Sequence, residues 1–372
     1  MASYWLEEPA PPLRSGPLDG PADVEVVGGG VTGCSVALTL ARAGLRVRVH
    51  EAREIASGAS GRNGGFALRG GAMAYHEAIL QLGRDRAAAL WRLTEDGLRT
   101  LAALAGDAFR LTGSFRLAAD GAELESVRAE FEALLADGFA AEWIEPLPPQ
   151  LERFSGGFRH VPDGAIQPAR WVRRLAAEAA AAGAELRERS RVRSLDELEA
   201  PQVVVATDGY TRDLLPEVDA HVGPVRNQVV VTEPLDELLF PFPHYARHGY
   251  DYWHQLADGR LVAGGRRDAD AEAEATAEEE LTPLIQARLE AFVTELLGRL
   301  PTITHRWAGI FGSSPDGLPL AGAVPGRDGV WVALGYAGHG NVLGLVCGDL
   351  VARAILGEPP PALELFDPAR VL

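Results

Sequence analysis

The chain has 372 residues, 47% hydrophobic and 23% charged, which suits one large domain or two interleaved ones and excludes disorder, collagen and disulfide scaffolds. Its 52 acidic residues outnumber 35 basic ones, and the formal net charge of -17 makes nucleic acid and anionic lipid poor partners. All basic residues are arginine, which excludes lysine-dependent PLP chemistry and Walker-type nucleotide binding.

The cysteines and the terminal segment indicate a cytoplasmic protein. Cys34 and Cys347 lie far apart in apolar stretches, so we expect neither a disulfide framework nor a metal site. Residues 1–20 carry prolines and acids without the apolar centre of a signal peptide, and we expect an arm. Because no run approaches ~18 apolar residues, we predict no membrane span.

The first predicted elements form a βαβ unit. A short apolar strand, Asp23–Val27, is followed by a periodic helix, Val31–Ala43, and an alternating strand, Leu45–Val49. Glu25 breaks the pattern of the first strand, where burial on both faces favours an aliphatic residue.

Helices and β-type segments alternate along the rest of the chain. We predict a hairpin over Phe109–Ala118, centred on Thr112-Gly113-Ser114, and a solvated acidic stretch over Asp268–Glu280. The predicted helices are Ala74–Ala105, Ala122–Leu135, Ala169–Ala182, Leu281–Leu300 and His339–Leu356, and the β-type segments are Glu185–Val192, Gln202–Ala206, His221–Val262 and Val330–Leu334. Since βα segments flank antiparallel-looking ones, we expect two domains, each discontinuous.

A glycine-rich turn joins the first strand to the first helix. Gly28-Gly29-Gly30-Val31-Thr32-Gly33 fits GxGxxG, and Glu51 ends the next strand. Bare backbone at a positive helix N-terminus accommodates a diphosphate, while an acid at the second strand end accepts ribose hydroxyls. The pattern predicts an adenine dinucleotide and leaves NAD and FAD both open.

Three further blocks are rich in small residues. Ser57–Phe66 follows the second strand and is either a flexible loop or a flavin-binding loop, with Ser60, Arg62 and Asn63 as hydrogen-bonding groups. Val203–Tyr210 reads as a buried strand and turn. Ser313–Pro319 and Gly335–Asn341 place another glycine turn before the last helix, whose N-terminus suits the negative charge of a reduced flavin.

These four blocks together resemble FAD-dependent oxidoreductases of the D-amino acid oxidase family, in the group of glycine oxidase, sarcosine oxidase and gamma-glutamylputrescine oxidoreductase. The resemblance covers nearly the whole chain and includes Ser3-Tyr4-Trp5 in the arm and Gly338-His339-Gly340. It implies an α/β fold with a Rossmann-type FAD-binding domain, residues 1–90, 155–216 and 302–372. A second, mainly antiparallel α+β substrate domain then comprises residues 91–154 and 217–301.

The resemblance also implies the activity and the cofactor contacts. Such enzymes oxidise the C–N bond of a small-molecule amine or amino acid by hydride transfer to flavin N5, the imine is hydrolysed, and O2 reoxidises the flavin to give H2O2. The implied FAD contacts are Gly28, Gly30, Val31, Thr32, Gly33, Glu51, Ala52, Arg53, Ser60, Gly61, Arg62, Asn63, Gly64, Gly65, Val192, Ala206, Thr207, Gly209, Asp316, Gly338, His339, Gly340 and Asn341.

Two departures from the family pattern modify this expectation. Gly309 stands where sarcosine oxidases carry the flavin-linking cysteine, so we expect FAD to be noncovalent. Val342 falls roughly where those enzymes have a substrate-binding lysine, and the chain has no lysine to assist oxygen. An FAD dehydrogenase that passes electrons to a quinone or carrier protein, a NAD-dependent dehydrogenase and a flavin-bound partner subunit without turnover remain alternatives.

Four side chains are candidates for contact with substrate. Tyr250 and Tyr252 lie in the β-rich region from which the family draws its substrate wall, although aromatic residues on strands more often pack in a core. Arg69, just after the flavin loop, suits an anionic substrate unless it is a solvated surface residue. His339 is the best candidate, and it also fits a structural cap of the last helix.

Overall fold

Six strands drawn from separate parts of the chain form one mainly parallel sheet in the computed structural model, which describes residues 3–372 apart from the side chain of Asp213. Its order is β16-β17-β10-β1-β2-β9, and only β16 and β17 pair in antiparallel fashion. The strands are β1 (Val24–Val27), β2 (Val47–His50), β9 (Glu185–Arg187), β10 (Gln202–Val205), β16 (Leu320–Ala323) and β17 (Val330–Leu334). This arrangement is the expected Rossmann-type sheet, and its predicted first βαβ unit is confirmed.

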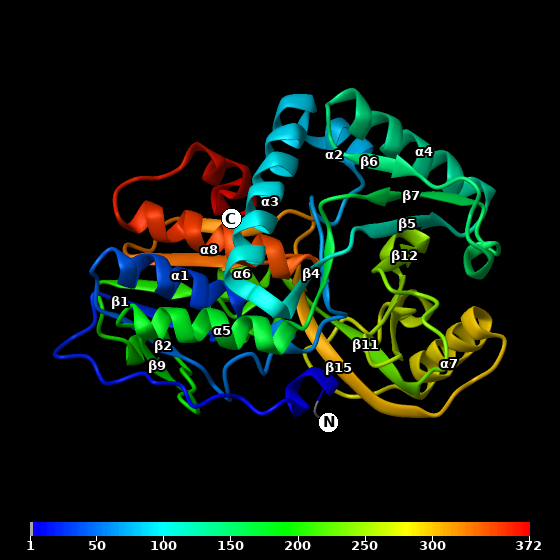
Figure 1. The fold of residues 1–372 in the computed structure, drawn as a ribbon. Coiled ribbons are helices and arrows are strands. Elements are labelled where there is room, and N and C mark those ends of the chain that lie inside the picture. The colour runs from blue at the N-terminus through cyan, green and yellow to red at the C-terminus, as the bar shows by residue number, and fades with distance from the viewer. Residues whose placement is uncertain (1–2) are drawn as a thin grey trace.

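Helices α1 (Val31–Arg42), α5 (Pro168–Ala181) and α8 (Gly340–Ile355) cover one face of this sheet, with α1 packed against both others (Figure 1). Valines at alternate strand positions, among them Val24, Val26 and Val49, fill the layer between sheet and helices. The predicted helix over Ala74–Ala105 is two helices, α2 (Tyr75–Leu82) and α3 (Arg84–Ala105). Gly83, with φ +82°, separates them.

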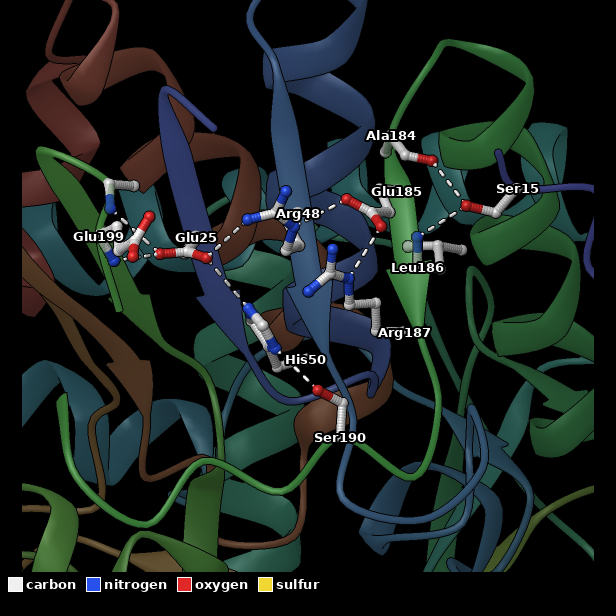
Figure 2. Close-up of polar contacts among 11 residues, drawn as sticks. Ser15, Glu25, Arg48, His50, Ala184, Glu185, Leu186, Arg187, Ser190 and Glu199 are labelled. Atoms are coloured by element: carbon white, nitrogen blue, oxygen red, sulfur yellow. Dashed lines mark hydrogen bonds and ion pairs between the residues drawn. The ribbon is translucent and has the colours of Figure 1, made fainter. Parts of the chain in front are cut away.

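The opposite face of the sheet explains Glu25. Figure 2 shows this carboxylate between two side chains of the neighbouring strand β2, Arg48 and His50, and the backbone at Glu199, and it is 3% exposed. Its Oε1 accepts hydrogen bonds from Arg48 (3.1 Å) and from His50 Nε2 (3.2 Å), while its Oε2 accepts the backbone N–H groups of Glu199 and Ala200. Burial raises the pKa of Glu25, but these donors outweigh burial and lower it.

Eight strands form a second, mainly antiparallel sheet, with the order β15-β11-β14-β13-β12-β5-β7-β6. They are β5 (Ser114–Ala118), β6 (Ala141–Trp143), β7 (Gly156–His160), β11 (Gly223–Pro234), β12 (His244–Ala246), β13 (Asp251–Gln255), β14 (Arg260–Gly265) and β15 (Ile303–Ser313). Helices α4 (Gly121–Ala136) and α7 (Pro283–Leu297) lie at the two ends of this sheet (Figure 1). The antiparallel second region of the predicted fold class is confirmed.

The predicted hairpin over Phe109–Ala118 is wrong. Its two arms exist as β4 (Phe109–Leu111) and β5, but β4 pairs with β8 (Gly164–Ile166), which also pairs with β3 (Phe66–Ala67). Strand β5 instead pairs with β7 and β12. The physical reason is that the turn at Gly113 is held from outside, because its N–H donates to the Asp163 carbonyl at 2.7 Å.

Two strands lie in a different sheet from the one that the predicted division into domains implies. Strands β7 and β15 belong to the eight-stranded sheet, although the division assigns residues 155–216 and 302–372 to the FAD-binding domain. The division therefore stays a prediction. The β-type stretch Glu185–Val192 is shorter than predicted, because the strand ends at Arg187. Within residues 3–372, no helix combines the length and the apolar character that crossing a membrane requires.

Candidate functional site

One cavity of about 700 Å³ lies between the two sheets and gathers most of the predicted site. Its wall includes the start of α1, the loop after β2, the residue after β10, the start of β13, the segment after β14, the last part of β15 and the turn before α8. The predicted residues that line it are Gly30, Val31, Thr32, Ser60, Arg62, Asn63, Gly64, Arg69, Ala206, Tyr250, Tyr252, Gly338, His339, Gly340 and Asn341. A cavity of this size, partly apolar and with few polar groups, is typical of a small-molecule site.

The other predicted contacts do not line this cavity. They are Gly28, Gly33, Glu51, Ala52, Arg53, Gly61, Gly65, Val192, Thr207, Gly209 and Asp316. Asp316 pairs with Arg370 at 2.7 Å and accepts the Leu318 N–H, while Arg53 pairs with Glu279 at 2.9 Å. Val192 lies beyond the end of β9. The cofactor roles of these residues remain predictions.

The glycine turn before α1 needs glycine for close packing. Gly28 has φ +112°, and a Cβ there would lie 2.5 Å from the Ala206 carbonyl oxygen. A Cβ on Gly33 would lie 1.9 Å from the Gly28 carbonyl oxygen, so α1 can approach β1 only without a side chain. Glu51 accepts the Gly29 N–H at 2.8 Å, which ties the end of β2 to the turn. The N-terminus of α1 is thereby aimed at the cavity.

Three side chains outside the loop after β2 hold three consecutive carbonyl groups of that loop. Ser3 Oγ donates to Gly61 O at 2.6 Å, Trp307 Nε1 donates to Arg62 O at 2.8 Å, and Trp5 Nε1 donates to Asn63 O at 2.8 Å. The predicted arm is therefore anchored from residue 3 onward, and residues 1 and 2 lie outside the described residues. These bonds fix the backbone orientation of the loop that lines the cavity.

The start of α8 borders the cavity and contacts the loop after β2. Asn341 Nδ2 donates to Asn63 Oδ1 (3.1 Å) and to Phe66 O (2.7 Å), which connects α8 to the loop. His339 occupies the N-cap position, and its Nδ1 has no hydrogen-bond partner among residues 3–372. Burial lowers the pKa of His339 to about 4, so the imidazole is neutral near pH 7.

Tyr252 and Tyr250 form an aromatic wall. Tyr252 lies between two glycines. A Cβ on Gly64 would lie 2.6 Å from the tyrosine ring, and a Cβ on Gly264 would lie 2.2 Å from the tyrosine hydroxyl. Burial raises the pKa of Tyr252, so its hydroxyl stays protonated. The guanidinium of Arg267 stacks 4.4 Å from the Tyr250 ring centroid and also lines the cavity.

Arg69 is a buried residue, so the reading of it as a solvated surface residue is wrong. It is 4% exposed and donates to Glu95 at 2.6 Å and to His160 Nδ1 at 3.0 Å. Its partners come from α3 and β7, which are distant in sequence. Contact with substrate remains a prediction for Arg69.

The sequence reasoning missed several residues of the cavity wall. Asp208 accepts the backbone N–H groups of Gly312 (2.9 Å) and Gly335 (2.8 Å), and it stood inside the recognised Val203–Tyr210 block. Glu274, expected in a solvated stretch, is 1% exposed and pairs with Arg226 at 2.9 Å. Other missed residues are Arg116, Glu130, His160, Asn227, Tyr245, Arg267 and Tyr336. They come from strands, from helix α4 and from turns that are far apart in the sequence, and apart from Tyr336, which stood inside the recognised Gly335–Asn341 block, no local motif marks them.

Comparison with known proteins matches the sequence to one family. Residues 23–354 match the family model described as DAO, FAD dependent oxidoreductase. The chain is 29% identical over 384 residues to the probable oxidoreductase OrdL of Rhizobium meliloti, covering 95% of this chain and 86% of that protein. It is 27% identical over 381 residues to gamma-glutamylputrescine oxidoreductase of Escherichia coli, with 93% and 85% covered.

Solved structures show the same fold. L-proline dehydrogenase from P. horikoshii has a TM-score of 0.78 at 21% identity, covering 95% of this chain and 98% of that one. Glycine oxidase from Geobacillus kaustophilus has a TM-score of 0.73 at 23% identity, covering 94% and 98%.

The residues present fit FAD. The side-chain-free turn at Gly28–Gly33 and the N-terminus of α1 suit the diphosphate, and the N-terminus of α8 with its neutral His339 suits the flavin ring. A Cβ on Gly309 would lie 2.9 Å from Arg62 Cβ, so this position has little room for a linking side chain. This crowding supports the expected noncovalent attachment.

Proposed function

Because the chain belongs to the DAO family of FAD dependent oxidoreductases, we propose that it oxidises the C–N bond of a small-molecule amine or amino acid. One observation carries the proposal. A single cavity joins the N-termini of α1 and α8 to the aromatic wall of Tyr250 and Tyr252. Such a cavity can hold an amine carbon against a flavin. The relatives named glycine oxidase and gamma-glutamylputrescine oxidoreductase support this substrate class.

Bound FAD would supply the two-electron oxidation of the amine C–N bond to an imine, which water hydrolyses, with O2 as the electron acceptor that gives H2O2. The chain's own residues orient and enclose the substrate. Phe66 packs edge-on against Tyr252 with ring centroids 5.6 Å apart, which makes this part of the cavity wall apolar. His339 offers a neutral imidazole whose Nδ1 is available to a ligand, and the α8 N-terminus stabilises negative charge next to it.

A dehydrogenase that passes electrons to a quinone or carrier protein is the second candidate. The absence of lysine from the chain favours it, because the sarcosine oxidases that the sequence resembles use a lysine near the flavin to assist oxygen. Val342, which falls roughly where those enzymes have a substrate-binding lysine, is 1% exposed and supplies no cation at the start of α8.

Purified protein should be screened against amines and amino acids without air, with bleaching of the flavin absorbance near 450 nm as readout. Peroxide formation in air identifies an oxidase, whereas turnover only with an added quinone identifies a dehydrogenase. Failure of every amine and amino acid to bleach the flavin overturns the proposed function.

A further inference from the structure

A second polar cluster lines the same cavity away from the six-stranded sheet. We define it as Arg69, Arg116, Glu130, His160 and Tyr245, all of which contribute to the cavity wall. Except for Arg69, they come from β5, α4, β7 and β12, which Figure 1 shows on the side of the molecule opposite α1 and α5. An occupant that also reaches the start of α8 must therefore be elongated.

The positive charge of Arg116 is already paired with a carboxylate other than that of Glu130. Its NH1 group donates to Glu123 Oε1 at 2.6 Å, and both side chains are at most 6% exposed. Glu123 is fixed further by the backbone N–H groups of Ala119 (2.8 Å) and His248 (2.8 Å). The contact between Arg116 Nε and Glu130 Oε2 is longer, at 3.7 Å. Glu130 therefore shares a cation whose closer, hydrogen-bonded partner is Glu123.

Glu130 is buried without a full set of partners. It is 4% exposed, and its Oε1 accepts one hydrogen bond, from the Tyr75 N–H at 3.2 Å. Its Oε2 accepts no hydrogen bond from any residue that the structure describes. A carboxylate can accept about four hydrogen bonds, and an under-partnered buried one is costly. Burial accordingly raises the pKa of Glu130.

The remaining members of the cluster cannot supply the missing positive charge. Arg69 pairs with Glu95 at 2.6 Å. His160 Nδ1 accepts from Arg69, because a guanidinium only donates, so a neutral His160 carries its proton on Nε2. Burial and the two nearby arginines hold the pKa of His160 well below its usual value. A positively charged ligand group is what this part of the cavity lacks.

We propose that Glu130 binds the distal ammonium group of an aliphatic diamine whose other amino group lies at the flavin end of the cavity. This inference rests on the proposed function only for the amino group of the diamine that is oxidised, not for the ammonium group at Glu130. The ammonium donates to Glu130 Oε2, and the ring of Tyr245 flanks the cluster, since Arg116 already lies 5.5 Å above its centroid. Glu130 then selects diamines over monoamines of the same length.

Binding is measured by calorimetry on holoenzyme whose flavin is reduced chemically, which prevents turnover, with 1,4-diaminobutane and 1-aminobutane as probes. We expect wild type to bind the diamine about 10- to 100-fold more tightly, and Glu130→Gln to abolish this preference. Glu132→Gln is the matched control, because it removes one carboxylate from the exposed side of the same helix. This control should retain the diamine preference.

A series of diamines with three to six carbons tests the contact geometrically. Glu130→Asp keeps the charge but retracts it by one methylene, so the preferred diamine should become one carbon longer. If Glu130→Gln fails to bind FAD, Glu130→Asp tests the subsite in its place. Equal binding of diamine and monoamine by wild type, or a preference that survives in Glu130→Gln, overturns the subsite. Glu130-dependent diamine binding without flavin bleaching by any amine overturns the proposed function and leaves the subsite intact.

Discussion

The indole Nε1 of Trp5 donates a 2.8 Å hydrogen bond to the carbonyl oxygen of Asn63, 58 residues away in sequence. Trp5 is 2% exposed, and it packs edge-on against Trp307, which holds the neighbouring carbonyl of Arg62. The N-terminal segment therefore supports the loop that lines the cavity. It contacts the face of this loop that points away from the cavity. Two indole groups and one serine hydroxyl together determine the orientation of three successive peptide groups.

The Trp5→Phe substitution should weaken FAD binding. Phenylalanine keeps most of the packing but removes the donor to Asn63, so the loop loses one fixed peptide group. We expect the Kd for FAD, measured by flavin fluorescence on refilling apoprotein, to rise about 3- to 10-fold. Trp331→Phe is the control, because it loses a hydrogen bond to Gln202 at the far end of β17. An unchanged Kd in Trp5→Phe would contradict the supporting role.

The Gly264→Ala substitution should displace Tyr252 from the cavity wall. A Cβ there would lie 2.2 Å from the tyrosine hydroxyl, closer than nonbonded contact allows. We expect kcat/KM for the best amine substrate to fall at least about tenfold, the cost expected when a positioning contact is lost, with FAD content unchanged. Gly223→Ala is the control, because it also lies in a strand and a Cβ there meets no atom within 4 Å. Equal kinetics in the two variants would exclude Tyr252 from substrate positioning.

The Arg267→Met substitution distinguishes carboxylate-bearing substrates from plain amines. Arg267 lines the cavity, stacks on Tyr250, and forms no ion pair with a described residue. If the substrate is an amino acid, its carboxylate can pair with this guanidinium, and the variant should raise KM about 10- to 100-fold. A plain amine should be almost unaffected. Steady-state kinetics with an amino acid and its decarboxylated amine measure both, and parallel losses would contradict a carboxylate contact.

Acid should destabilise the fold through buried neutral histidines. Burial lowers the pKa of His244 to about 3, against about 6.5 in an unfolded chain. The unfolded state therefore binds one more proton between these values, so stability is full above about pH 6.5 and falls as the pH drops toward 3.

The His244→Asn substitution should reduce the slope of unfolding free energy against pH by about one proton in this window. Denaturant unfolding at pH 4 to 7 measures this slope. His248→Asn is the control, because His248 is exposed. The same slope in wild type and His244→Asn would show that His244 is not held neutral by the fold.

Local features of the sequence determined the nucleotide turn. Gly28, Gly33 and Glu51 lie within one βαβ unit, where strand length, helical periodicity and the need for bare backbone are all encoded by near neighbours. The small-residue loop carrying Asn63 and the glycine turn carrying His339 were found for the same reason. Their side chains line one cavity.

Strand pairing and charge pairing required the tertiary structure. The turn at Gly113 looked like a hairpin because turn residues do not specify which strand pairs with which. Glu25 looked out of place until Arg48 and His50 lay beside it in the neighbouring strand. Glu130 gave no signal at all, since the cavity that it lines is built from strands more than one hundred residues apart. Backbone conformation depends on neighbours in sequence, whereas burial and ion pairing depend on neighbours in space.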